Sequence, residues 1–199
     1  ANSSGLLSDL FIKRFVKHNL INSFAGESKA NIELTYELKN KKVSMKLSSS
    51  LEGMAFNIIS PFNKSSDDAQ NFQLSYAIEK NRKNRINIKY DSYDIELSKA
   101  ESNLYAMVNS PYLSGTLVLP DKISSDDRLT ARLKYFDLNK FQGIADPAVY
   151  PYLDMSMKRV KINNYYFDDF KIRTSPLSNG MLIDQLDFAN SDLVMTGNG

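Results

Sequence analysis

A two-residue period in the apolar side chains runs through all but the first part of this chain, and it constrains the fold more than any other feature. In "ANIELTYEL" the apolar residues Ile32, Leu34 and Tyr36 alternate with Glu33 and Thr35. Successive side chains of a β-strand point to opposite faces, so this period predicts strands with one apolar and one polar face. The alternation recurs at Val43 to Leu47, Phe72 to Ile78, Ile86 to Tyr90, Tyr93 to Leu97, Leu104 to Val108, Leu129 to Tyr135, Leu153 to Met157, Phe170 to Ile172, Ile183 to Phe188, and Leu193 to Met195.

Short polar segments separate these runs, among them Asp91-Ser92, Asn163-Asn164 and Ser178-Asn179-Gly180. Asn and Gly tolerate the positive φ that hairpin turns require. A parallel connection needs a dozen or more residues, so gaps this short predict antiparallel neighbours. We expect an all-β fold of about eleven or twelve strands in a large antiparallel meander sheet.

The beginning of the chain departs from this period. Its apolar residues stand near helical spacing, and Gly26 follows the last of them, so we predict a short N-terminal helix within residues 1–25. The apolar positions are Leu7, Leu10, Phe11, Phe15, Leu20 and Phe24.

A second break, "FQGIADPAVYPYLD", contains Pro147 and Pro151 and predicts a loop. We therefore expect one β-rich domain over residues 1–199, with a first sheet portion over 28–142 and closing hairpins over 152–199. An open sheet of this size must curl or split into a packed sandwich. The two-residue period does not distinguish these alternatives.

Composition excludes several classes of protein. The 199 residues are 42% hydrophobic and 24% charged, which is too apolar for a disordered chain. The net charge of +2 gives no electrostatic case for a nucleic acid partner. The chain has no cysteine, so it forms no disulfide and no thiolate metal site, which suits the periplasm and the cytosol equally. It contains neither a run of ~20 apolar residues nor a signal peptide, and we expect it to be a piece of a longer protein.

Catalytic chemistry is also not indicated. The single histidine, His18, falls on the basic side of the predicted helix and has no partners for a triad or a metal site. The carboxylate pairs Asp67-Asp68, Asp126-Asp127 and Asp168-Asp169 fall in predicted turns, where solvation explains them. We expect a protein that is not an enzyme and has no cofactor or metal.

Two stretches about sixty residues apart share one pattern: Leu-x-Gly, a short apolar run, then Pro and Lys. They are "LSSSLEGMAFNIISPFNK", with Gly53 and Pro61, and "NSPYLSGTLVLPDK", with Gly115 and Pro120. Glycine in a strand removes a side chain where the strand bends or another backbone approaches. Proline ends the strand because it cannot donate to the ladder.

The first stretch resembles a sequence block of the YhdP-type AsmA-like proteins, large envelope proteins of Gram-negative bacteria. Ile59-Ser60 departs from the Leu-Pro of that family. Later segments are similar to the family in the same order: "SPYLSGTLVLPDK", "LTARLKYFDL", "DPAVYPYLDMSMKRVKINNYYFDDFKI", with Asp169 where the family usually has Gly, and "NGMLIDQLDFANSDLVMTGNG". The resemblance extends over about residues 20 to 199. The matching positions of the first block are Ser49, Leu51, Gly53, Met54, Phe56, Ile58, Pro61, Phe62 and Lys64.

The resemblance implies a periplasmic segment of a protein anchored in the inner membrane, with a long curved β-sheet whose apolar concave side is an open, half-barrel-like groove. It implies conduction of phospholipids toward the outer membrane, with acyl chains, adjoining segments of the same chain and other envelope proteins as partners. Two alternatives stay open: a structural or interaction β module of the envelope, and a half-barrel carrier of a single lipid. The candidate lipid-groove residues are Ile32, Leu34, Tyr36, Leu74, Tyr76, Ile86, Ile88, Ile95, Leu97, Leu133 and Met155.

Overall fold

A computed structural model describes most of the chain, and 77% of the residues it describes lie in strands. The predicted all-β, mostly antiparallel fold is therefore confirmed. The chain divides into two compact units, residues 1–99 (unit 1) and 100–199 (unit 2). The described residues are 1–10, 24–39, 41–57, 60–78, 85–100, 103–120, 128–141, 152–177, 180–190 and 193–199.

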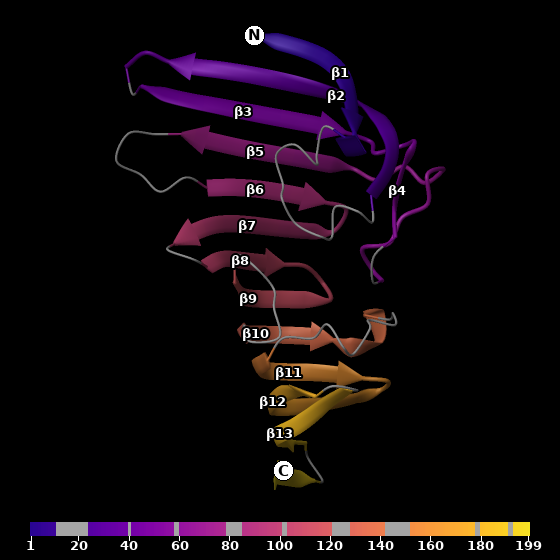
Figure 1. The fold of residues 1–199 in the computed structure, drawn as a ribbon, viewed down its shortest axis with the longest axis vertical. Helices are drawn as coiled ribbons and strands as arrows, with labels where there is room; N and C mark the ends of the chain where they lie inside the picture. The colour runs from indigo at the N-terminus through magenta and orange to yellow at the C-terminus, as the bar shows by residue number, and fades with distance from the viewer. Residues whose placement is uncertain are drawn as a thin grey trace. The chain divides into compact units, whose positions relative to one another are not determined.

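Unit 1 is an antiparallel sheet with the strand order β1-β2-β3-β5-β6-β7 (Figure 1). The short strand β4 lies outside this order and pairs with the first residues of β2. The turn at Asp91-Ser92 joins β6 directly to β7, as the polar break predicted, whereas residues 50–71 lie between β3 and β5. The strands are β1 (Asn2–Ser8), β2 (Phe24–Glu37), β3 (Lys42–Ser49), β4 (Met54–Phe56), β5 (Phe72–Ile78), β6 (Arg85–Tyr90) and β7 (Tyr93–Ala100).

The predicted helical lead-in over residues 1–25 has a strand at each of its ends, and only Asp9 and Leu10 are helical among its described residues. Strand β1 occupies Asn2–Ser8 and pairs antiparallel with β2, and β2 already begins at Phe24. The sequence before Leu7 is rich in serine and asparagine, which are weak helix formers, and edge pairing with β2 satisfies its backbone. Leu7 is buried there. Residues 11–23, which carry most of the helical spacing, lie outside the described residues.

The first Leu-x-Gly stretch covers one end of the unit 1 sheet. Leu51 and Met54 are among the most buried side chains of the unit. The ring of Phe56 lies 6.0 Å from that of Tyr90, and the ring of Phe62 lies 4.9 Å from that of Tyr93. We call residues 50–57 and 60–70 the cover. The cover gives unit 1 a second layer, but only at the end of the sheet where β2 begins.

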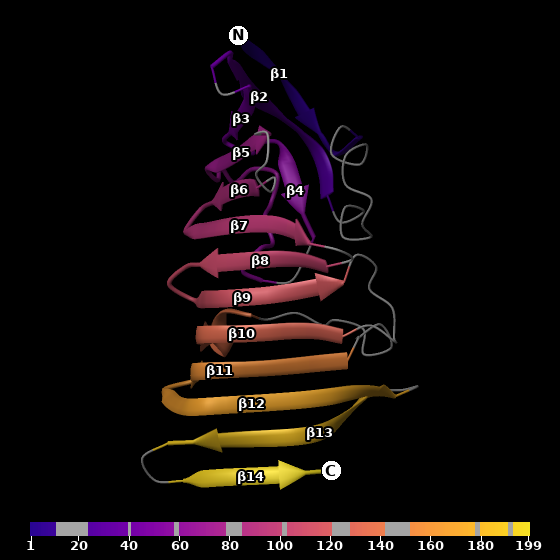
Figure 2. The same cartoon turned by 90° about the vertical axis from the view of Figure 1, so that its left-hand side faces the viewer.

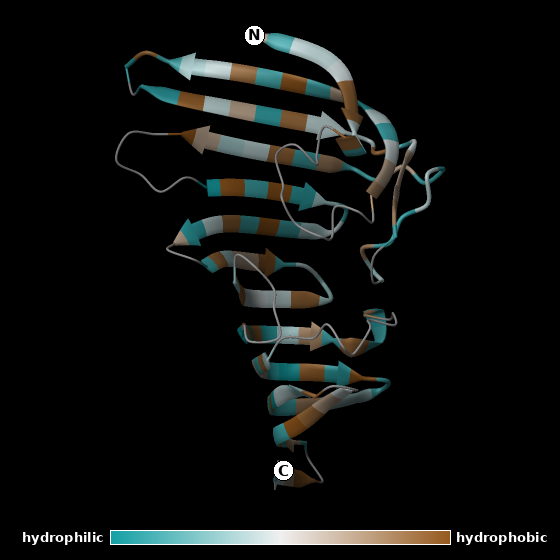
Figure 3. Cartoon of the chain, in the orientation of Figure 1, coloured by the Kyte–Doolittle hydropathy of each residue, from teal (hydrophilic) through white to brown (hydrophobic). Residues whose placement is uncertain are grey.

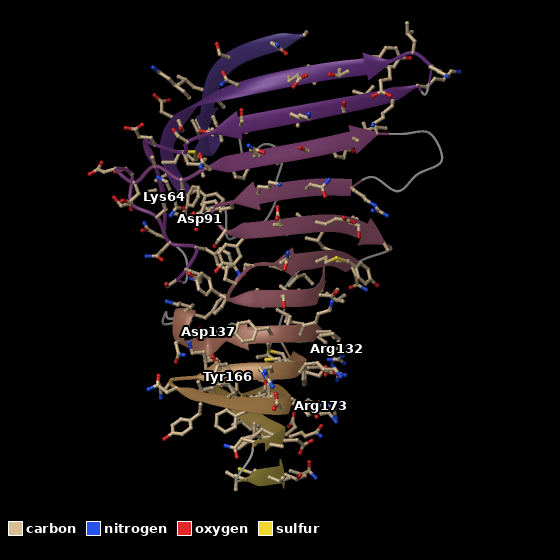
Figure 4. All side chains as sticks on the ribbon, turned by 180° about the vertical axis from the view of Figure 1, so that it is seen from behind. Lys64, Asp91, Arg132, Asp137, Tyr166 and Arg173 are labelled. Carbon is tan, nitrogen blue, oxygen red and sulfur yellow. The ribbon has the colours of Figure 1, made fainter. Side chains whose placement is uncertain are left out.

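A buried lysine fastens the cover. Lys64 Nζ donates to the carbonyl oxygens of Met54 (2.7 Å) and Ser65 (2.8 Å). Figure 4 shows Lys64 at the same end of unit 1 as Asp91, which lies in the β6–β7 turn. Burial lowers the pKa of Lys64, against the opposing influence of Asp68. The lysine of the sequence pattern is thus a structural cross-link between carbonyl groups.

Unit 2 contains strands β8 to β14 in sequence order (Figure 2). All described neighbours are antiparallel except β10 and β11, which pair in parallel. The long break predicted as a loop separates these two strands, and a parallel neighbour requires a connection of that length. The strands are β8 (Asn103–Asn109), β9 (Leu113–Pro120), β10 (Arg128–Asp137), β11 (Tyr152–Ile162), β12 (Tyr165–Leu177), β13 (Gly180–Ala189) and β14 (Val194–Asn198), with a 3-10 turn η2 (Leu138–Lys140) after β10.

The pair Asp168-Asp169, predicted in a turn, lies instead within β12. Asp169 has a φ of 49° and interrupts the pairing of β12 with β13. This is a β-bulge, in which one extra residue bends the strand and a left-handed conformation favours glycine or a short polar residue. Asp67 lies in a turn, as predicted, whereas Asp126-Asp127 fall outside the described residues.

Both Leu-x-Gly glycines lie where another backbone approaches, which is one of the two roles that the sequence pattern left open. Gly53 has a φ of 91°, and a Cβ added there would collide with the carbonyl oxygen of Glu27. Gly115 has a φ of 141°, and its added Cβ would lie 2.6 Å from the Cα of Leu133. Each glycine therefore permits a left-handed backbone and a close strand contact at once.

Alanine at either glycine should destabilise the fold. We expect Gly53→Ala and Gly115→Ala each to lower the free energy of unfolding by at least about 2 kcal/mol, because the backbone must shift. Gly5→Ala is the matched control, since an added Cβ at Gly5 meets nothing within 4 Å. Urea unfolding of the three variants measures the difference. Equal stability of all three would contradict the assigned role of the two glycines.

Candidate functional site

Backbone pairing aligns the apolar side chains of unit 1 in rows that cross the strands. Residues paired across antiparallel strands share a face, so each row follows directly from the register. All the predicted residues of β2, β5, β6 and β7 fall on one face, which we call the apolar face. Its first row is Ile32, Leu47, Leu74, Ile88 and Ile95; its second is Leu34, Met45, Tyr76, Ile86 and Leu97; its third is Tyr36, Val43 and Ile78.

The rows differ in exposure. Beside the cover, Tyr90 pairs with Tyr93 and both are buried, and Leu47 in the first row is only 6% exposed. At the other end of the strands Tyr36 is 58% exposed and Ile78 is 47% exposed. The cover therefore hides one end of the apolar face and leaves the end near the β2–β3 turn open to solvent.

The opposite face of unit 1 is polar, and Figure 3 shows the resulting alternation of hydropathy along the strands. Cross-strand ion pairs lie on it: Lys42–Glu37 (3.8 Å), Arg85–Glu96 (3.2 Å) and Lys89–Asp94 (3.6 Å). Such exposed pairs add little stability, so they chiefly keep this face soluble and in register. A hollow on this side is lined mainly by polar side chains, including Asn31, Lys46 and Gln73.

Val43, Met45, Leu47 and Ile78 complete the rows, although they are absent from the predicted set. Their alternation is the same as that of the residues predicted, so the sequence contained the signal that would have included them. What the sequence lacked was the strand pairing that puts them beside the predicted residues.

Leu133 and Met155, the two predicted residues of unit 2, lie in adjacent strands. Leu133 is buried and pairs with Gly115 on β9 and Met157 on β11. Met155 is half-buried and pairs with Ala131 and Ile172. Leu133 therefore belongs to the core of unit 2, and the apolar face of unit 1 carries the more accessible part of the predicted set.

The charges of unit 2 that lie beside Met155 in sequence are mutually compensated. Arg132 Nη1 donates to Asp154 Oδ1 at 2.9 Å, and this hydrogen bond lowers the pKa of the Asp154 carboxyl. Arg173 pairs with Asp154 across β11 and β12, and Figure 4 labels both arginines. The Arg132 hydrogen bond joins β10 to β11, and the nearby charge of Arg173 on β12 also lowers the pKa of Asp154.

Tyr90 is a buried titratable group at the covered end, and its surroundings shift the pKa of its phenol. Among the described residues its buried oxygen has no hydrogen-bond partner. Burial, with the nearby Asp91 and Tyr93, raises the pKa of Tyr90 to about 12. The neutral phenol is therefore strongly favoured in the folded protein.

Within the part of the chain described, His, Cys, Asp and Glu side chains form no group of three that could hold a metal. His18 lies outside the described residues. In the same part, no helix is long and apolar enough to cross a bilayer. No family model, curated protein or solved structure matches the chain.

A charge should be tolerated at the open end of the apolar face and not beneath the cover. We expect Leu34→Asp to change the free energy of unfolding by no more than about 1 kcal/mol, because Leu34 is 49% exposed and its replacement stays hydrated. Leu47→Asp should lower that free energy by more than about 3 kcal/mol, because the carboxylate becomes buried without a partner. Denaturant unfolding compares the two. Equal destabilisation would show that the whole face is closed.

Ionisation of Tyr90 should destabilise the folded protein at high pH. In the unfolded chain its phenol ionises near pH 10, whereas in the folded protein it ionises near pH 12. Raising the pH through this window lowers the free energy of unfolding, because the unfolded state releases the proton first. We expect Tyr90→Phe to lack this component while keeping full stability at pH 7. Parallel stability curves for the two proteins between pH 9 and about 12 would contradict the assignment.

Proposed function

We propose that this chain is a segment of a periplasmic bridge, anchored in the inner membrane of a Gram-negative bacterium, that conducts phospholipids toward the outer membrane. One observation carries the proposal. The first and second apolar rows of unit 1 cross β2, β3, β5, β6 and β7 without an intervening polar side chain, and the third row, on β2, β3 and β5, is exposed. An exposed apolar surface on a protein domain marks an interaction site.

The chemistry of the rows suits sliding rather than tight binding. Each buried CH₂ of an acyl chain is stabilised by ~0.8 kcal/mol, so contact with Leu34, Tyr76 or Ile86 would hold a tail against water. The rows contain no charged group that would fix one position. Acyl chains are the proposed ligand, while head groups would remain in water. In this proposal the chain has no catalytic role and uses no cofactor.

Under this proposal the chain has two further kinds of partner: adjoining segments of the same chain and other envelope proteins. Nucleic acid is not a proposed partner. A structural or interaction module of the envelope is the second candidate, and the cover favours it, because Leu47, Tyr90 and Tyr93 are already buried within unit 1. A half-barrel carrier of one lipid would instead require an enclosed site. Continuity of lipid contact along the rows separates these functions.

Site-specific photo-crosslinking in the presence of phospholipid tests the proposal. A photoreactive residue is placed at Leu34, Ile86 or Ile88 on the apolar face, and at Glu33 or Asn87 on the polar face as matched controls one residue away. We expect lipid adducts at the apolar positions alone, because only these side chains would contact acyl chains. Mass spectrometry of the adducts identifies the lipid.

Ile88→Asp gives a second measurement. A carboxylate in the first row should block lipid transfer, whereas Asn87→Asp, on the opposite face of the same strand, should leave it intact. Circular dichroism must show that both variants are folded. Equal labelling of the two faces, or no labelling of either, would leave only the structural function.

A further inference from the structure

The turn between β2 and β3 combines exposed apolar and basic side chains at the open end of the apolar face. Leu38 in this turn is 80% exposed, and the adjoining Tyr36 is 58% exposed. Lys39 and Lys41 are exposed on either side of the turn. We call residues 36–39, 41 and 42 the tip. It lies at the end of β2 opposite to the one that pairs with β4 (Figure 1).

We propose that the tip docks on the surface of an anionic lipid bilayer. Leucine and tyrosine are suited to the boundary between head groups and acyl chains, where an apolar body meets a polar neighbour. Lysines beside them attract anionic head groups and hold their own charges in the head-group layer. Lys39, Lys41 and Lys42 outnumber the single acid of the tip, Glu37, so the net charge of the tip complements such a surface.

The backbone fits this role. The Lys41 amide donates to the carbonyl oxygen of Leu38 (3.3 Å), which closes a tight turn, and Lys41 has a φ of 47°. Lys42 is held near Glu37 at 3.8 Å. Leu38 is therefore presented at the extremity of a paired hairpin, so little ordering is required when it enters the bilayer. The contact would be continuous with the third row of the apolar face, through Tyr36.

This proposal stands apart from lipid conduction, because docking requires only the tip and not the rows behind it. The partner is a bilayer surface rather than a single lipid molecule. Failure of vesicle binding would leave the crosslinking pattern of Ile86 and Ile88 unchanged. Loss of that crosslinking pattern would in turn leave vesicle binding by the tip unchanged.

Vesicle cosedimentation of the 199-residue chain tests the proposal. The probes are vesicles of phosphatidylethanolamine with phosphatidylglycerol, and vesicles of phosphatidylcholine alone. We expect binding to the anionic vesicles that weakens as salt is raised, because screening reduces the attraction of the lysines. Lys39→Gln and Lys41→Asn should each weaken the partition about fivefold. Asparagine is chosen at position 41 because it tolerates a left-handed backbone. Leu38→Asp should weaken it at least about tenfold.

Matched controls remove the same groups elsewhere in unit 1. Lys89→Gln removes one exposed lysine from the polar face, and Leu6→Asp changes a leucine of β1 that is 60% exposed. Both should bind vesicles like the unaltered chain. Because the chain contains no tryptophan, Leu38→Trp supplies a single reporter whose emission should shift to shorter wavelength with anionic vesicles. Leu6→Trp should show no shift.

Three results would overturn the proposal. The first is the absence of binding to the anionic vesicles. The second is equal loss in the tip variants and their controls, which would mean that only overall charge matters. The third is concentration-dependent self-association that Leu38→Asp abolishes while vesicle binding is absent, which would make a second copy of the chain the partner.

Discussion

The cross-strand register of the backbone is the constraint on which the rest of unit 1 depends. Because Ile32 pairs with Leu47, and Leu47 with Leu74, alternation within single strands becomes continuous rows across the sheet. A shift of one residue in any pair would send an apolar set to the polar side, where the ion pairs such as Arg85–Glu96 lie. The proposed function requires apolar and polar side chains on opposite faces of the sheet, and the hydrogen-bonded strand pairing produces this separation.

The cover determines which part of the apolar face is buried. Gly53 allows the backbone to pass close to Glu27, and Lys64 then fastens the segment through the carbonyl oxygens of Met54 and Ser65. These contacts bury one end of the apolar face and confine its exposure to the other end. The same sheet thus combines a stabilising core with an accessible apolar surface, and the exposed tip adjoins the accessible side.

Much of the fold was predictable from the alternation, and the errors have physical causes. Short turns such as Asp91-Ser92 predicted antiparallel neighbours, because a parallel connection needs a dozen or more residues. A helix was predicted within residues 1–25 because Leu7 shares helical spacing with Leu10, yet residues 2–8 form a strand, since edge pairing with β2 outweighs that weak local preference. The turn expected at Asp168-Asp169 is a bulge, since a polar pair with left-handed geometry serves either structure.

The sequence by itself determined which side chains within one strand share a face, because alternation follows from local geometry. It could not determine which of those side chains remain accessible. Leu34 and Leu47 have the same residue type and belong to the same alternation, yet one is 49% exposed and the other 6%. Only tertiary structure decided this, because exposure depends on where the cover, distant from Leu34 along the strand, packs against the sheet.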